Sequence, residues 1–213
     1  MSGVGDKIDL ITYQNGAYTS EENWIAMGQS IASNAPKGAL VIGIWHPMEG
    51  KRLDLCRVFS EHYNYASYGV RSLQAFHTNL LNIMPGKSKG VHYAHSEGGI
   101  IYNRSFERME KGDKERMQKH FYYEGIGPGE RTPKDYGIYA KSTYSKDDWV
   151  TGNFKGGSND KYDVKWVAAL SPAHERVMYF ADHAFLGKTY QSVVKSSLGN
   201  FNERFGFYVG NSR

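Results

Sequence analysis

The sequence has a single cysteine, few prolines and no long hydrophobic run. Cys56 is the one cysteine among 213 residues, and there are 6 prolines. A lone cysteine excludes a disulfide framework and a cysteine metal cluster, and its apolar setting favours a small buried side chain over a reactive thiol. No apolar stretch approaches the roughly 18 residues that a membrane span requires, so we expect no transmembrane segment.

Neither sign of charge dominates: 26 Lys and Arg stand against 22 Asp and Glu, a formal net charge of +4. Basic residues gather only over residues 111–119, where acidic residues alternate with them. This is typical of a solvated helix face, so we expect no nucleic-acid partner. The N-terminus lacks the pattern of a signal peptide. We therefore expect a cytoplasmic protein, or one exported by a signal that this sequence does not display.

Apolar runs alternate with amphipathic stretches along the chain. This predicts a parallel sheet wrapped by helices, that is, an α/β fold with three layers. Thr19 and Glu22 have the spacing of a capping box for the first helix. Strands are expected at residues 8–13, 39–45, 91–95, 121–123, 136–140 and 164–170, and the later helices at 73–84, 98–111 and 189–198. We expect a single domain over residues 1–213, compatible with being part of a longer chain.

The stretch from Val91 to Gly99 is the most informative. It predicts a strand, a serine at position 96 and a helix, with small residues at Ala94 and Gly98. A nucleophilic serine needs such a sharp strand-to-helix turn, because only small residues fit where strand and helix nearly touch. The backbone amide of Glu97 would then donate to an oxyanion at the helix N-terminus. The alternative is a serine that only caps a helix.

The chain order Ser, acid, His, with each residue at the carboxyl end of a strand, selects the partners of Ser96. Asp148 is preferred over Asp147 as the acid, because Trp149 and Val150 follow it directly. His183, which precedes the last helix, is preferred as the base over His174, which follows another predicted strand.

A second oxyanion donor is expected from Gly16 or Ala17, because glycine allows close approach of backbone to substrate; an ordinary Asn-Gly turn is the alternative. His92 and His95 lie three apart on a predicted strand and should point to opposite faces, so no shared metal is expected. Residues 152–160 are expected to form a loop, either walling a substrate cleft or without a role.

Several segments together resemble the α/β-hydrolase superfamily of lipases and esterases, and most closely an uncharacterised lipase-like family of chlamydiae. The resemblance implies that Ser96, Asp148 and His183 form a catalytic triad. Ala94 departs from the wider superfamily, where glycine is commoner. The segments that carry it are Asn15-Gly16, 19–22, 53–55, His95-Ser96-Glu97-Gly98, 146–150, 182–185 and Thr189-Tyr190.

These observations predict a serine hydrolase that cleaves a carboxylic ester, with a lipid ester among the candidate substrates, and with no cofactor and no metal. Ser96 would attack the acyl carbonyl after His183 removes its proton, forming an acyl-enzyme that water releases. The alternative is a non-catalytic binding or effector module that keeps the hydrolase scaffold. Fold alone does not decide between them.

Overall fold

Strands and helices alternate along the chain in the computed structural model, which describes residues 9–47, 56, 58, 60–61, 66–148, 159–170 and 183–199. In chain order the elements are β1 (Asp9–Gln14), α1 (Glu21–Asn34), β2 (Leu40–Ile44), α3 (Tyr68–Ile83), β3 (Lys89–Ser96), α4 (Glu97–Arg108), α5 (Lys111–His120), β4 (Phe121–Pro128), β5 (Tyr139–Ser145), β6 (Val164–Val167) and α7 (Lys188–Gly199).

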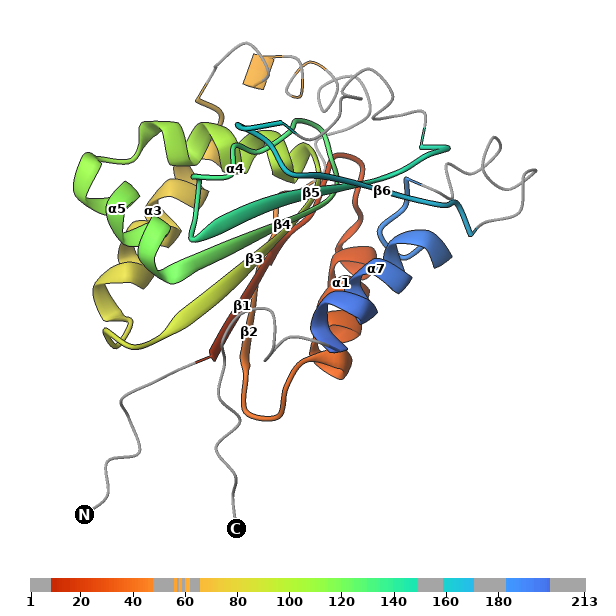
Figure 1. Cartoon of the computed structure of the whole chain (residues 1–213), viewed down its shortest axis with the longest axis horizontal. Helices are drawn as coiled ribbons and strands as arrows, with labels where there is room; N and C mark the ends of the chain where they lie inside the picture. Colours follow the sequence, from red (N-terminus) through yellow and green to blue (C-terminus); the bar gives the residue numbers. More distant parts are fainter. Residues whose placement is uncertain are drawn as a thin grey trace.

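The six strands form one sheet in the order β2-β1-β3-β4-β5-β6, and every pair is parallel. Helices α3, α4 and α5 lie on one face, and α1 and α7 lie on the other (Figure 1). Each face has its own apolar core, one centred on Leu73 and Ile101, the other on Ile31 and Val194. The predicted three-layer α/β fold class with a parallel central sheet is confirmed.

The strand order reverses between β1 and β3. The chain runs from β1 outward to β2, and then returns to the other side of β1 to form β3. In open parallel sheets such a switch point leaves a crevice outside the carboxyl ends of the two strands, where ligands bind. The loop after β1 begins at Asn15, and β3 ends at Ser96, so the predicted nucleophile lies at this switch point.

Some predicted bounds differ from those observed. The apolar run 39–45 was expected to be covered on both sides, but β2 is an edge strand and only half-buried. The predicted helix 98–111 is two helices, because α4 ends at Arg108 and the charged segment after it forms α5, which buries only Met117. Strand β5 is shifted from the predicted 136–140 toward the polar residues 141–145.

Two predictions about single residues were wrong. The N-cap of α1 is Ser20, not Thr19: the Ser20 hydroxyl accepts a hydrogen bond from the Asn23 amide at 3.3 Å. The Thr19 hydroxyl instead donates to the Gly16 carbonyl oxygen at 2.9 Å, because it lies one residue too early to reach the first turn. Cys56, expected to be buried, is exposed.

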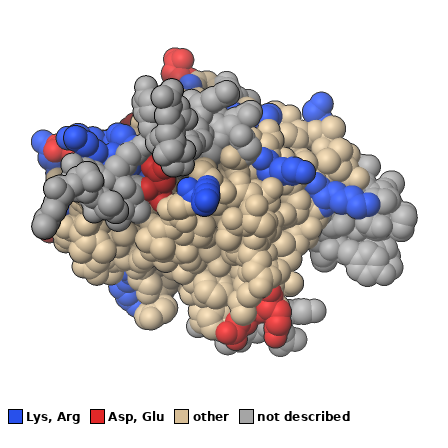
Figure 2. All heavy atoms as spheres, turned by 90° about the horizontal axis from the view of Figure 1, so that it is seen from below, with Lys and Arg blue, Asp and Glu red and all other residues tan. Residues whose placement is uncertain are grey.

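Charged side chains are spread thinly over the face drawn in Figure 2. The described part of that face is mostly uncharged, and Lys and Arg form small separate groups rather than one continuous patch. Within the described ranges, no helix is both long enough and apolar enough to cross a membrane.

Candidate active site

Ser96 is both the last residue of β3 and the residue before α4. Its backbone has φ 51° and ψ −122°, a region that costs a non-glycine residue about 1–3 kcal/mol. Its hydroxyl makes no capping hydrogen bond to α4, so helix capping does not account for this serine. Gly98 permits the turn, because a Cβ at this position would lie 2.9 Å from the Asn15 carbonyl oxygen.

The hydroxyl of Ser96 faces an imidazole from far along the chain. The Nε2 atom of His183 lies 2.9 Å from Ser96 Oγ, and the Nδ1 atom of the same ring lies 2.9 Å from Asp148 Oδ2. With Asp148 ionised, Nδ1 donates to its carboxylate, which leaves Nε2 to accept from the serine hydroxyl. Of the two candidate acids, Asp148 is buried against His183, and Asp147 is exposed.

Tyr190 also contacts the Asp148 carboxylate, a role that sequence reasoning missed. Its hydroxyl donates to Asp148 Oδ2 at 2.6 Å and accepts from the Ser145 amide at 3.2 Å. Burial, followed by the nearby Asp148 charge, raises the pKa of Tyr190 well above its usual value. The phenol therefore keeps its proton and can donate to an ionised carboxylate.

His95 binds the backbone of His183. Its Nε2 donates to the His183 carbonyl oxygen at 2.6 Å, and its ring packs against Phe185. Burial, assisted by the neighbouring His183, lowers the pKa of His95 to about 3, so the ring is neutral near pH 7. His92 lies on the opposite face of the sheet, where it contacts the Thr12 hydroxyl and Tyr102.

Gly16 lies directly against Ser96. A Cβ on Gly16 would come within 2.4 Å of Ser96 Cβ, so only glycine leaves room for the serine. The Gly16 carbonyl oxygen accepts from Asn15 Nδ2 at 3.0 Å and from Thr19 Oγ1 at 2.9 Å. These bonds fix the peptide plane between residues 16 and 17, and its N–H points away from the clamped oxygen.

A pocket of about 510 Å³ opens beside these residues. Its described lining includes Ala17, one of the two candidates for the second oxyanion donor, and also His95 and Ala184, which are chain neighbours of Ser96 and His183. The rest of that lining is largely apolar and comes from the start of α1 and the loop before α7, and it includes Tyr18, Met27, Phe185 and Leu186.

Two predictions fall on residues outside the described ranges: the rival base His174, and most of the loop predicted at 152–160. The group of metal-type ligands found in the described part of the chain consists of His46, Glu61 and Glu97. It does not include Ser96, Asp148 or His183.

Comparisons with known proteins find similarity among solved structures. No family model and no curated protein matches the sequence, so they lend no support to the chlamydial resemblance. Among solved structures, a cutinase-like protein from Cryptococcus sp. is similar over 90% of this chain and 95% of its own, with 10% sequence identity and a TM-score of 0.35.

Proposed function

We propose that this protein is a serine hydrolase that cleaves carboxylic esters, with Ser96 as nucleophile, His183 as base and Asp148 as the residue that orients the base. The observation that carries the proposal is the continuous contact from Ser96 Oγ through the His183 ring to Asp148 Oδ2, with both links at 2.9 Å. The strained backbone of Ser96 and its freedom from helix capping also support it, since both suit a hydroxyl held for reaction.

The reaction proceeds in two halves. His183 Nε2 takes the Ser96 proton as Oγ attacks the acyl carbonyl, and the resulting imidazolium is stabilised by Asp148. His183 then protonates the leaving alkoxide, which departs as an alcohol and leaves the acyl group on Ser96. Water attacks this ester with His183 again as base; the carboxylic acid leaves and Ser96 regains its proton.

The oxyanion formed in both halves would accept hydrogen bonds from backbone amides. Glu97 N–H is the first amide of α4, where the helix dipole also favours negative charge. The second donor in this proposal is either the Gly16 amide or the Ala17 amide, and the clamped Gly16 carbonyl orients the Ala17 amide. Such a donor contributes about 2.7–4 kcal/mol to the stability of the transition state.

The proposed substrate class is an ester with an apolar acyl chain. The pocket beside Ala17 and Ala184 is lined mainly by apolar side chains, and burying a methylene group contributes about 0.8 kcal/mol. We expect kcat/KM toward p-nitrophenyl esters to rise from the acetyl to the octanoyl ester. A flat or falling series would contradict the apolar acyl chain while leaving the hydrolase proposal intact.

Reaction with a fluorophosphonate probe tests the function itself. We expect the folded protein to be labelled at one serine, and Ser96→Ala to abolish labelling. Ser33→Ala, at an exposed serine of α1, is the matched control and should label like the wild type. His183→Ala and Asp148→Asn should fold normally and lose about 10⁴-fold in kcat. A folded wild type that neither labels nor hydrolyses esters would overturn the proposal in favour of a non-catalytic module.

A further inference from the structure

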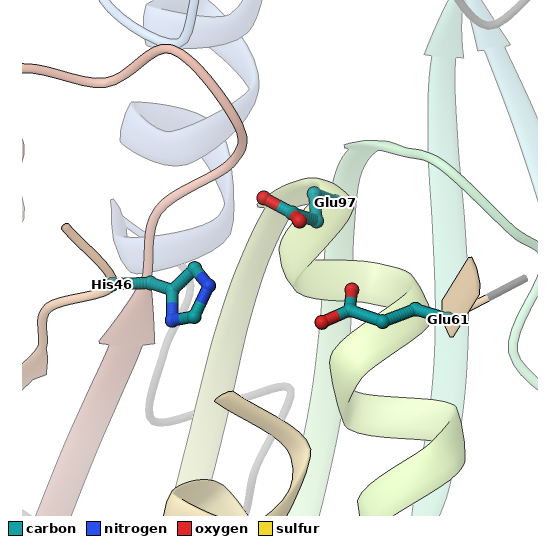
Figure 3. Close-up of side chains that lie close together, drawn as sticks. All are labelled: His46, Glu61 and Glu97. Atoms are coloured by element: carbon teal, nitrogen blue, oxygen red, sulfur yellow. The ribbon is translucent and has the colours of Figure 1, made fainter. Parts of the chain in front are cut away.

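Three side chains with metal-binding atoms meet on the α3 and α4 side of the sheet. His46 follows β2, Glu61 lies between β2 and α3, and Glu97 is the first residue of α4. Figure 3 shows the imidazole and the two carboxylates turned toward a common space. One ligand atom from each lies within 4.8 Å of the others, and the three residues are 6%, 0% and 1% exposed.

Neighbouring residues fix the positions of His46 and Glu61. Asn15 clamps the backbone of His46: its Oδ1 accepts from the His46 amide, and its Nδ2 donates to the His46 carbonyl oxygen, both at 2.8 Å. A Cβ on Gly69 would lie 2.7 Å from His46 Cε1, so this glycine leaves room for the ring. Arg104 Nε donates to the Glu61 carbonyl oxygen at 3.0 Å. Such outer contacts orient ligands in metal sites.

An independent observation comes from Gln14, the last residue of β1. Side chains two and four residues apart on a strand share a face, so Gln14 points to the same face as Leu10, which packs in the core below α3 and α4. Gln14 is 1% exposed, and neither atom of its amide has a hydrogen-bond partner among the described residues. A buried amide left this way costs about 1–3 kcal/mol, which points to a polar ligand at this end of the sheet.

The charge of the cluster suits a divalent cation. With both carboxylates ionised and the imidazole neutral, as metal ligands are, the three side chains carry a charge of −2, which a divalent cation would balance. One nitrogen with carboxylate oxygens is a donor set for Zn²⁺ or Mn²⁺ rather than for Ca²⁺, which takes oxygen ligands. Bonds of about 2.0–2.2 Å place tetrahedral ligands about 3.3–3.6 Å apart, so the three side chains would draw together around the ion.

We propose that His46, Glu61 and Glu97 bind one divalent transition-metal ion, Zn²⁺ or Mn²⁺, and that water on the ion reaches the amide of Gln14. The ion would tie the end of β2 and the segment before α3 to the first turn of α4. This role is separate from ester hydrolysis, because binding does not depend on the reactivity of Ser96.

Metal binding by the tag-free full chain tests the proposal. After chelation and dialysis, the protein is titrated in turn with Zn²⁺, Mn²⁺, Mg²⁺ and Ca²⁺ by calorimetry, and its melting temperature is measured with each ion. We expect one Zn²⁺ or Mn²⁺ per chain with a higher melting temperature, and weaker binding of Mg²⁺ and Ca²⁺. No binding by the folded wild type would overturn the proposal.

Variants assign the ion to these residues. Glu61→Gln should weaken binding more than 100-fold, since loss of an outer contact alone typically costs about 10–100-fold. Glu115→Gln, at an exposed carboxylate of α5, should bind like the wild type. Equal binding by a folded Glu61→Gln would place the ion elsewhere and overturn the proposal. If Glu61→Gln does not fold, the visible spectrum of Co²⁺ bound to the wild type is compared with that of His46→Gln. The d–d bands should shift or disappear when the nitrogen ligand is lost, and identical spectra would also overturn the proposal.

Discussion

At the scale of single residues, several hydrogen bonds of the candidate site orient Asp148 and His183. Asp148 Oδ2 accepts hydrogen bonds from both His183 Nδ1 and the Tyr190 hydroxyl. His183 is also held through its carbonyl oxygen by His95. Tyr190 and His95 are thus positioning residues in the proposed reaction, because each acts through Asp148 or His183.

Tyr190→Phe tests this positioning. The substitution keeps the ring and removes the 2.6 Å bond to the carboxylate, and a hydrogen bond to a charged group contributes about 1.5–3 kcal/mol. We expect kcat for a p-nitrophenyl ester to fall roughly tenfold with KM unchanged, since the carboxylate matters most when His183 is charged.

Tyr139→Phe is the matched control for that variant. The Tyr139 hydroxyl also donates to an aspartate at 2.6 Å, but its partner is Asp163 and the residue is exposed. This control should keep the wild-type kcat. A Tyr190→Phe enzyme with unchanged kcat would remove Tyr190 from the proposed machinery.

At the scale of elements, the loop from β1 to α1 and the turn from β3 to α4 meet at the switch point of the sheet. Gly16 and Ser96 lie against each other there, and a methyl group on Gly16 would overlap the serine side chain at 2.4 Å. One of the two elements would have to move away, which would also move the amides proposed as oxyanion donors.

Gly16→Ala should therefore lower the rate of fluorophosphonate labelling by about 100-fold or more, the effect of losing one oxyanion donor. Circular dichroism should show that the protein remains folded. Gly86→Ala is the control, because a Cβ at that turn meets nothing within 4 Å. Labelling of Gly16→Ala at the rate of Gly86→Ala would mean that this contact does not position the donors.

At the scale of the whole molecule, three buried histidines link stability to pH. Burial lowers the pKa of His77 and of His95 to about 3, and burial with the neighbouring His77 lowers the pKa of His92 well below 6.5. As pH falls below about 6.5, the unfolded chain binds protons at these residues and the folded chain does not. The free energy of unfolding therefore falls with falling pH.

His77→Phe measures this linkage. From about pH 7.5 to 5.5, each such histidine should lower the free energy of unfolding by about 1.4 kcal/mol. In urea titrations the variant should lose less stability than the wild type by about that amount. Phe76→Leu, which alters a ring packed beside His77 without removing a titratable group, should keep the wild-type pH dependence. If the free energy of unfolding of His77→Phe falls as much as that of the wild type over this pH range, the linkage is contradicted.

Local patterns in the sequence were sufficient for the fold class and for the position of Ser96. Apolar runs alternating with amphipathic stretches require helices on both sides of a parallel sheet, and only small residues fit around a serine in a sharp strand-to-helix turn. Chain order then selected Asp148 and His183, which lie within hydrogen-bond distance of each other and of Ser96. Their catalytic roles remain our proposal.

Contacts between distant segments were decided only by the tertiary structure. Tyr190 meets Asp148 across 42 residues and His95 meets His183 across 88, and neither pairing leaves a local pattern. The polar segment 141–145 is a strand because β4 and β6 pair with it, not because it is apolar. The cluster of His46, Glu61 and Glu97 likewise combines three segments without a ligand spacing motif, because folding alone brings their side chains together.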